Sequence, residues 1–200
     1  MKLKRILATL LLAVSVAASG ADNNFDPFSA NIEENIATPA VSAKASQAVV
    51  NAMSQLAKAL RGAGYKVDAV RKGEVVLVTI PCVNLFSANS VELKKDASKR
   101  LSPLVPYIKR SDNFKVILAV HADDTGDDIY AERITADRAN AIDEFFFQAN
   151  NRHDTGIIPY GLGADEPIAP NTGVGNRAKN RRVEIYFVPT QQLIDKARKR

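Results

Sequence analysis

The sequence predicts an α/β fold of the α+β two-layer sandwich type, in which a mixed β-sheet carries helices packed on one side. Between residues 43 and 190, segments with helical apolar spacing alternate with short apolar runs, in a βαβαβ-type order plus a final strand. Hydrophobic residues make up 46% and charged residues 24% of the chain, which is typical of a globular protein. The single cysteine, Cys82, cannot form an internal disulfide, so a packed core must stabilise the fold.

The first 21 residues are typical of a secretory signal peptide. Residues 1–5 are basic, residues 6–18 are apolar, and small residues follow at 18–21, as signal peptidase requires. The apolar run is too short to span a bilayer, and no later segment is long and apolar enough to do so. We therefore expect cleavage after Gly20 or Ala21 and a mature chain in the bacterial envelope with no transmembrane segment.

Residues 22–42 mix Asn, Asp, Ala and two prolines without a period, so the sequence predicts a flexible tether. The next unit, residues 43–74, is expected to hold a helix and the first strand of a hairpin. Residues 65–70 and 74–80 have strand character, and Arg71-Lys72-Gly73 between them is a hairpin signal. The helix is predicted from apolar residues at helical spacing and from the glycines that close it: Val49, Met53, Leu56 and Leu60, then Gly62 and Gly64.

The main domain, residues 75–190, continues with a helix over 97–108, which Pro103 and Pro106 should kink near Ser102. A mostly apolar run of strand length follows over residues 114–122, and a long helix is expected over 128–149. Then come a short strand over 157–160, a loop rich in Gly, Pro and Asn to about residue 175, and a last strand over 183–188. The basic C-terminal tail, residues 191–200, is expected to be either a short helix or a frayed terminus.

Charge and motif content exclude several classes of function. The formal net charge is +5, but the excess cations lie in the first 21 and the last ten residues, so the body is nearly neutral and a poor surface for nucleic acid. The chain has no P-loop and no Gly-x-Ser-x-Gly motif. His121, Asp123 and Asp124 lie within four positions, but no second cluster completes a metal site, so no metal and no cofactor is expected.

Arg138 is the first candidate functional residue. On the helix expected after residue 128, it lies between Ile134 and Ile142 and interrupts an apolar stripe. An unpaired buried guanidinium is unfavourable, so Arg138 needs an acceptor. Asp123, in the loop before this helix, is the natural acceptor, at the sheet edge where ligands of α/β proteins bind. A purely structural ion pair, or an Arg138 stem that extends to the surface, are the alternatives.

Three motifs resemble the OmpA-like domain of Gram-negative envelopes. They are His121-Ala-Asp-Asp-Thr-Gly126, Tyr130-Ala-Glu-Arg-Ile-Thr-Ala-Asp-Arg138-Ala139 and Asn176-Arg-Ala-Lys-Asn-Arg-Arg-Val-Glu-Ile185. The family typically shows Gly-His-Thr-Asp-x-x-Gly, Tyr-Asn-x-x-Leu-Ser-x-x-Arg-Ala and Gly-Arg-Ala-x-Asn-Arg-Arg-Val-Glu, in that order. The resemblance covers about residues 75–190, which is most of the expected mature chain.

This resemblance implies a non-catalytic module that binds peptidoglycan through the meso-diaminopimelate of an uncrosslinked stem peptide. The ligand-binding pair would be Asp123, from the first motif, and Arg138, from the second. The free end of diaminopimelate carries an ammonium group, which suits a carboxylate, beside a carboxylate, which suits a guanidinium. Further positions are auxiliary candidates: Ser87, Asn89, Thr125, Ala131, Thr135 and Arg181.

The expected function is non-covalent binding of peptidoglycan in the periplasm, with any link to the outer membrane made through a partner. One alternative is a protein–protein interaction subunit of an envelope complex with weak or no peptidoglycan binding and a partner on residues 22–70. A second alternative is a hydrolase that uses Asp123 and Asp124.

Arg181 and Arg182 begin the last strand and should point to opposite faces of the sheet. Departures from the family pattern favour the protein–protein interaction alternative: Ala122 for Thr, Ala131 for Asn, and Ser87-Ala88 for Asp or Asn and then Phe. Asn176 in place of Gly is a further departure.

Overall fold

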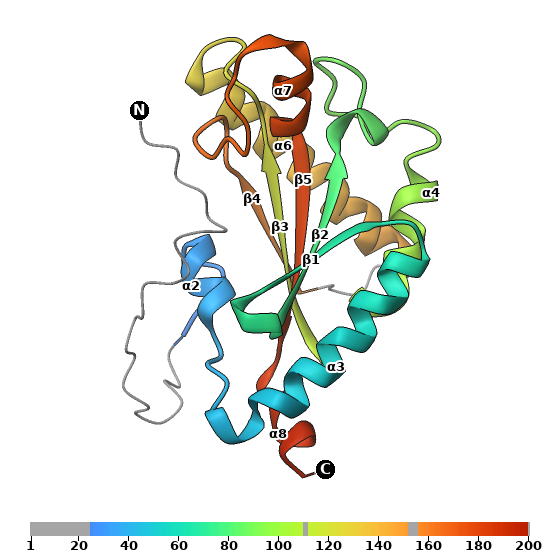
Figure 1. The fold of residues 1–200 in the computed structure, drawn as a ribbon. Coiled ribbons are helices and arrows are strands. Elements are labelled where there is room, and N and C mark those ends of the chain that lie inside the picture. Colours follow the sequence, from blue (N-terminus) through green and yellow to red (C-terminus); the bar gives the residue numbers. More distant parts are fainter. Residues whose placement is uncertain (1–24, 110–111, 152–155, 200) are drawn as a thin grey trace.

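The computed structural model describes residues 25–109, 112–151 and 156–199 of the chain. The expected signal peptide, residues 1–21, lies outside the described residues. Within them, the strands form a five-stranded sheet in the order β1-β2-β5-β3-β4 (Figure 1). Strands β3 and β4 are parallel and the other neighbours are antiparallel, which confirms the mixed sheet. The strands are β1 (Lys66–Val70), β2 (Val75–Pro81), β3 (Phe114–His121), β4 (Ile157–Gly161) and β5 (Arg182–Pro189).

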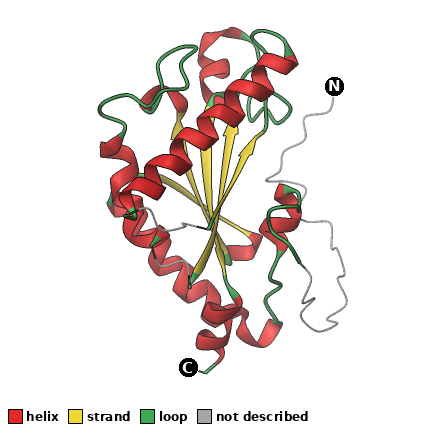
Figure 2. Ribbon diagram, turned by 180° about the vertical axis from the view of Figure 1, so that it is seen from behind, coloured by secondary structure: helices red, strands yellow, loops and turns green. Residues whose placement is uncertain are grey.

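The main core lies between one face of the sheet and two long helices (Figure 2). These helices are α3 (Ala43–Gly62) and α6 (Asp128–Ala149), and the second has the predicted bounds. Met53, Phe146 and Phe187 are fully buried in this core. The helix expected over 97–108 is kinked as predicted, because α4 (Ser98–Leu101) passes through a 3-10 turn at residues 102–104 into α5 (Val105–Ile108). No helix in the described ranges combines the length and the apolar character needed to cross a membrane.

The hairpin between β1 and β2 forms where the sequence predicts it. Its turn, Arg71–Gly73, places three successive residues at positive φ, with values of 48°, 55° and 92°. Gly73 is required here, because its backbone is left-handed and an added Cβ would come within 3.3 Å of Val50 on α3. The turn therefore fits closely against the helix that precedes the hairpin.

Residues 32–37 correct the expectation of a flexible tether over 22–42. They form helix α2 (Ile32–Ala37), which begins with a capping box between Asn31 and Glu34. Ile32 and Ile36 pack on the second face of the sheet, in a smaller core that includes Ile117 of β3. Helices are therefore not confined to one side of the sheet, as the sequence had suggested. The helix is too short to show an apolar period, and the capping box was its one signal in the sequence.

Polar contacts also hold α2 to the sheet. Asn35 is fully buried and donates hydrogen bonds of 2.7 Å to the Pro27 carbonyl and to Oη of Tyr160. Lys115 of β3 donates from Nζ to Asn35 Oδ1 at 3.0 Å and to Thr38 Oγ1 at 3.2 Å. Burial lowers the pKa of Lys115 to about 8. The segment is thus part of the folded domain.

Two further helices complete the fold. Helix α7 (Gly173–Asn180) begins within the predicted loop, which was expected to run to about residue 175, and continues through residues for which no element was predicted. Its glycines at 173 and 175 explain why no helix was expected there. Asn180 anchors its end: the side chain accepts from the Ile168 and Ala169 amides and donates to the Ala169 carbonyl. The tail forms α8 (Gln191–Arg198), a helix with buried Ile194 and Ala197 that packs beside α3, so it is not frayed over these residues.

Candidate functional site

Several chemically interesting side chains gather at one end of the sheet, which we call the top edge. Here β2, β3 and β4 end and β5 begins: Pro81 and His121 both pair with Arg182, and Val120 pairs with Gly161. The segments that follow these strands, together with α7, therefore surround the same end of the sheet (Figure 1). This is the edge at which the sequence placed Asp123 and Arg138.

Asp123 lies directly after β3 and is 4% exposed. Its Oδ1 accepts a hydrogen bond of 3.0 Å from the Thr125 amide, as in an Asx turn. Its Oδ2 forms an ion pair with Nη1 of Arg181, whose side chain is 41% exposed. Burial raises the pKa of Asp123, but the hydrogen bonds from Thr125 and the Arg181 guanidinium outweigh burial and hold the pKa below its ordinary value. Asp123 is therefore an anion at neutral pH.

Arg138 projects from α6 and is 6% exposed. Its Nε donates to the Ser90 carbonyl at 2.9 Å and its Nη2 donates to the Ser87 carbonyl at 3.3 Å. The guanidinium carbon lies 5.0 Å from the centroid of the Phe86 ring. Arg138 thus holds the segment 86–90 against α6. Its Nη1 donates no hydrogen bond to any residue in the described part of the chain.

The ion pair expected between Asp123 and Arg138 is not found in the described residues. Asp123 pairs with Arg181 instead, and Arg138 uses backbone carbonyls. Both groups nevertheless lie at the top edge, because Asp123 follows β3 and Arg138 donates to carbonyls of the segment after β2. Arg138 and Arg181 both lower the pKa of the buried thiol of Cys82. Burial raises the pKa of that thiol to about 11 in spite of the arginines, so Cys82 is a core residue and no nucleophile.

Of the six auxiliary candidates, Arg181 is the ion-pair partner of Asp123, and the other five divide into two groups. Ser87, Asn89 and Thr125 are exposed at the top edge, and Asn89 accepts a hydrogen bond of 3.4 Å from Oη of Tyr130. Ala131 and Thr135 face inward instead. Thr135 is fully buried, and its Oγ1 accepts from the Gly163 amide at 3.0 Å, so it positions the loop after β4. Two of the candidates are thus structural.

Sequence reasoning missed a buried polar network on the second face of the sheet. Arg182, Glu184 and Tyr186 alternate along β5 and therefore share one face. The strand begins at Arg182, and Arg181, which was expected to begin it too, is the C-cap residue of α7. Glu184 accepts from Arg182 Nε at 2.6 Å and from Tyr186 Oη at 2.5 Å, and it lies 3.3 Å from His121 Nε2. Burial raises the pKa of Glu184, but these neighbours bring it down to about 2. The alternation of polar residues in the Arg-x-Glu-x-Tyr sequence was the available signal.

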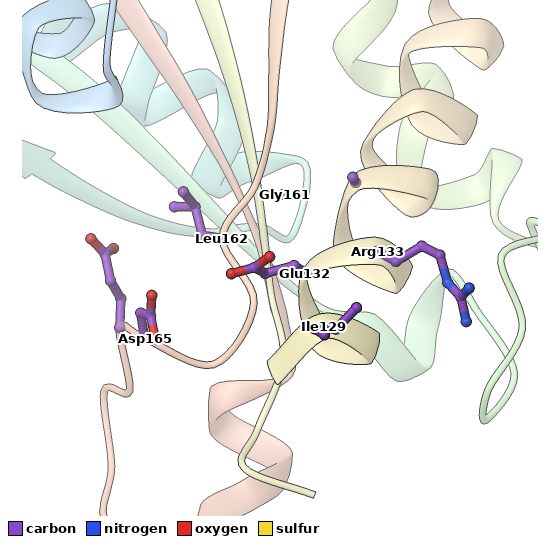
Figure 3. Close-up of a pocket in the computed structure, with 8 residues that line it drawn as sticks. Ile129, Glu132, Arg133, Gly161, Leu162 and Asp165 are labelled. Atoms are coloured by element: carbon purple, nitrogen blue, oxygen red, sulfur yellow. The ribbon is translucent and has the colours of Figure 1, made fainter. Parts of the chain in front are cut away.

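A separate pocket of about 550 Å³ lies on the other flank of α6 (Figure 3). Gly161 lines this pocket where β4 lies against α6. The two elements are so close there that a Cβ at residue 161 would overlap the backbone of Ala136. Glu132 points toward the loop that carries Leu162, whereas Arg133 points away from it (Figure 3). Neither Asp123 nor Arg138 lines this pocket, whose walls are Ile129, Glu132, Arg133, Ala136, Gly161, Leu162, Asp165 and Glu166.

Glu166, at the margin of this pocket, predicts a pH dependence of stability. Burial, together with the negative charges of Glu33 and Glu184, raises its pKa to about 7 from the ordinary 4.5. The folded state therefore binds a proton more tightly than the unfolded state, so the stabilisation is present below pH 4.5 and is lost as the pH rises through 7. Glu166→Gln, which stays neutral, is expected to raise Tm by about 2–4 °C at pH 8 and by less at pH 5. At pH 8 this shift corresponds to a gain of about 1 kcal/mol in the free energy of unfolding, after solvent screening is allowed for. Thermal melts measure this, with the exposed Asp165→Asn as control. An equal gain at both pH values would contradict it.

The described residues hold no group of three or more His, Cys, Asp or Glu side chains placed to bind a metal ion. The top edge instead offers a buried carboxylate and a buried guanidinium with one unused nitrogen. This arrangement can bind a zwitterionic group but supplies no activated nucleophile.

Comparisons with known proteins agree with the fold. The OmpA family matches residues 85–181. The outer-membrane lipoprotein YfiB of Pseudomonas aeruginosa is 32% identical over 107 residues, which are 54% of this chain and 62% of that protein. Among the curated relatives that it matches, the chain spans between 16% and 64% of their length.

Two solved structures share the fold. A MotB-like protein of Desulfovibrio vulgaris superposes with a TM-score of 0.61 at 24% identity, over 71% of this chain and 94% of that one. The cell wall anchor of the T6SS from Pseudomonas aeruginosa gives a TM-score of 0.55 at 23% identity, over 67% of this chain and 94% of that one. The two structures show the shared fold, and the family match shows that the segment from residue 85 to 181 belongs to the OmpA family.

Proposed function

We propose that this domain binds peptidoglycan non-covalently, through the free end of meso-diaminopimelate in an uncrosslinked stem peptide. The ligand's ammonium group would bind to Asp123, and its carboxylate would bind to Arg138. The chain would thereby anchor or scaffold a component of the Gram-negative envelope from the periplasm, without catalysing a reaction. The observation that supports this most strongly is that one buried anion, Asp123, and one buried cation, Arg138, both lie at the top edge of the sheet.

The geometry of each group suits its proposed partner. Asp123 is held as an anion, and charge-assisted hydrogen bonds from an ammonium group to a buried carboxylate are strong. Arg138 uses Nε and Nη2 for the loop and leaves Nη1 for a ligand carboxylate. The Asx turn at Asp123 and the Arg138 contacts fix both groups before the ligand arrives, which lowers the entropy cost of binding.

The comparisons support the same reading. One fold relative is described as a cell wall anchor, and one sequence relative is described as an outer-membrane lipoprotein. The proposal for this chain adds a specific ligand group and two residues, neither of which follows from those descriptions.

A second candidate function is a protein–protein interaction subunit of an envelope complex. The observation that favours it is that both proposed ligand-binding groups already have partners within the chain: Arg181 for Asp123, and the Ser87 and Ser90 carbonyls for Arg138. Exposed apolar residues on the same side of the fold, including Val83 after β2 and Val174 on α7, would suit a protein partner.

Sedimentation with insoluble sacculi tests the proposed function. The purified chain is expected to sediment with diaminopimelate-type sacculi and to stay in solution with lysine-type sacculi, which lack the second carboxylate. Asp123→Asn keeps the size of the side chain but removes its charge, and it is expected to weaken binding by about 10-fold to 100-fold, as the loss of a charge-assisted hydrogen bond implies.

Asp124→Asn is the matched control, because Asp124 lies next in the chain but is exposed and pairs with Arg177. It should sediment like the wild type. If the wild type stays in the supernatant, or if it binds both types of sacculi equally, the proposed function is wrong and the search turns to protein partners.

A further inference from the structure

Arg181 occupies the position at Asp123 that the proposed ligand needs. Its Nη1 pairs with Asp123 Oδ2, and Oδ1 is already used by the Thr125 amide. The Asp123 side chain is 5% exposed and that of Arg181 is 41% exposed, so the guanidinium is the solvent-facing partner of a buried anion. A second cation at Oδ2 would meet the positive charge of Arg181 at close range.

Hydrogen bonds hold the backbone of Arg181 in place, whereas its side chain is held by the ion pair with Asp123. The Arg181 carbonyl accepts from the Cys82 amide at 3.0 Å, and its amide donates to the Arg177 carbonyl at 3.1 Å. The preceding residue, Asn180, is fully buried and anchors the end of α7. The guanidinium, in contrast, forms its hydrogen bond and ion pair with Asp123 alone among the side chains of the described residues. The side chain can therefore leave Asp123 by rotamer changes without any movement of the backbone.

We propose that Arg181 is a self-occluding latch: it stands in for the ligand's ammonium group in the free protein and swings into solvent when a ligand binds. This inference rests on the proposed function and adds a regulatory residue to the same site. While the site is empty, Arg181 keeps Asp123 ionised and compensates its negative charge, so that this buried charge is not left unpaired. Its displacement lowers the affinity for every cationic ligand, and a ligand must also satisfy Arg138 to compensate.

Nearby Arg177 provides a matched comparison. It lies in the last turn of α7, which Arg181 directly follows, and it pairs at 2.9 Å with Asp124, the residue after Asp123. Both partners of this pair are exposed. If the arginines only stabilised the loop that carries Asp123 and Asp124, both of them would contribute to that effect. A latch role belongs to Arg181 alone, because only Arg181 contacts the proposed ligand-binding carboxylate.

Calorimetric titration of the full chain with a soluble diaminopimelate muropeptide tests the latch. Arg181→Ala and Arg181→Gln are both expected to bind about fivefold more tightly than the wild type, which corresponds to about 1 kcal/mol. Arg177→Ala should bind within about twofold of the wild type. Tighter binding is a result that a merely damaged structure would not give, and two Arg181 variants guard against a folding defect in one of them.

The pH profile provides a second readout. Because the Arg181 guanidinium lowers the pKa of Asp123, the variants should lose binding on acidification at a higher pH than the wild type. If the wild type binds, Asp123→Asn does not, and the Arg181 variants bind equally or more weakly, the latch is wrong but the proposed function stands. If neither the wild type nor any Arg181 variant binds, the latch and the proposed function are both wrong.

Discussion

Arg138→Ala is expected to lose peptidoglycan binding by about 30-fold or more. Arg138 has two tasks in the structure: its Nε and Nη2 fix the segment from Ser87 to Ser90, and its Nη1 remains for the ligand carboxylate. Truncation removes the ligand contact and also releases the loop beside it. Removal of one partner from a buried, hydrogen-bonded charge pair costs about 2–5 kcal/mol in other interfaces, which corresponds to this loss. Calorimetry with the same muropeptide measures it.

Arg138→Lys separates charge from geometry. A lysine keeps the positive charge, but its single ammonium group cannot reproduce the forked contacts with two carbonyls and a carboxylate. Most of the loss should therefore persist in this variant. Wild-type affinity in Arg138→Ala, with the fold intact by circular dichroism, would show that the guanidinium serves the loop and not the ligand.

Glu184→Ala is expected to have the largest effect on stability. Glu184 is 5% exposed and joins Arg182, Tyr186 and His121 on the second face of the sheet. Its removal leaves the Arg182 guanidinium buried beside β3 without its carboxylate, which costs about 3–5 kcal/mol. Tm should fall by about 10 °C, as scaling for a domain of this size gives.

The double variant Arg182→Met, Glu184→Leu tests the cause of that loss. Because apolar residues of similar size often replace a buried ion pair at little cost, the double variant should recover most of the Tm lost by Glu184→Ala. Arg177→Ala, which removes an exposed pair, should change stability by about 1 kcal/mol or less. A shift of less than about 2 °C for Glu184→Ala would show that the network is dispensable.

Periodicity predicted those parts of the fold that have a long apolar pattern. The helix over 128–149 has the predicted bounds, and Pro103 marked the kink between α4 and α5. The short helices α2 and α7 were not predicted, for physical reasons. Helix α2 has only six residues and is stabilised by its capping box and its contacts with the sheet. Helix α7 is rich in glycine and is anchored by Asn180. Such elements form through tertiary contacts that no local pattern shows.

The location of Asp123 and Arg138 at one edge of the sheet was predicted, but their partners within the chain were not. Burial of Arg138 and Asp123 at one edge followed from the stripe on the helix and from the position of the loop. The partners did not follow, because Arg181 and the Ser87 carbonyl reach the site from distant parts of the chain. Contacts between residues so far apart in the sequence depend on the sheet order, which brings β5 between β2 and β3.

The central claim is that Asp123 and Arg138 together bind the free end of diaminopimelate. The most direct test is a nuclear magnetic resonance titration of the full chain with a meso-diaminopimelate muropeptide, in which the carboxyl carbon of Asp123 and Nε of Arg138 are observed. Both signals are expected to shift with one saturation curve, and a lysine-containing muropeptide is expected to leave Arg138 Nε unmoved. Saturable shifts confined to the pocket beside Glu132 and Asp165, with Asp123 and Arg138 unchanged, would contradict it.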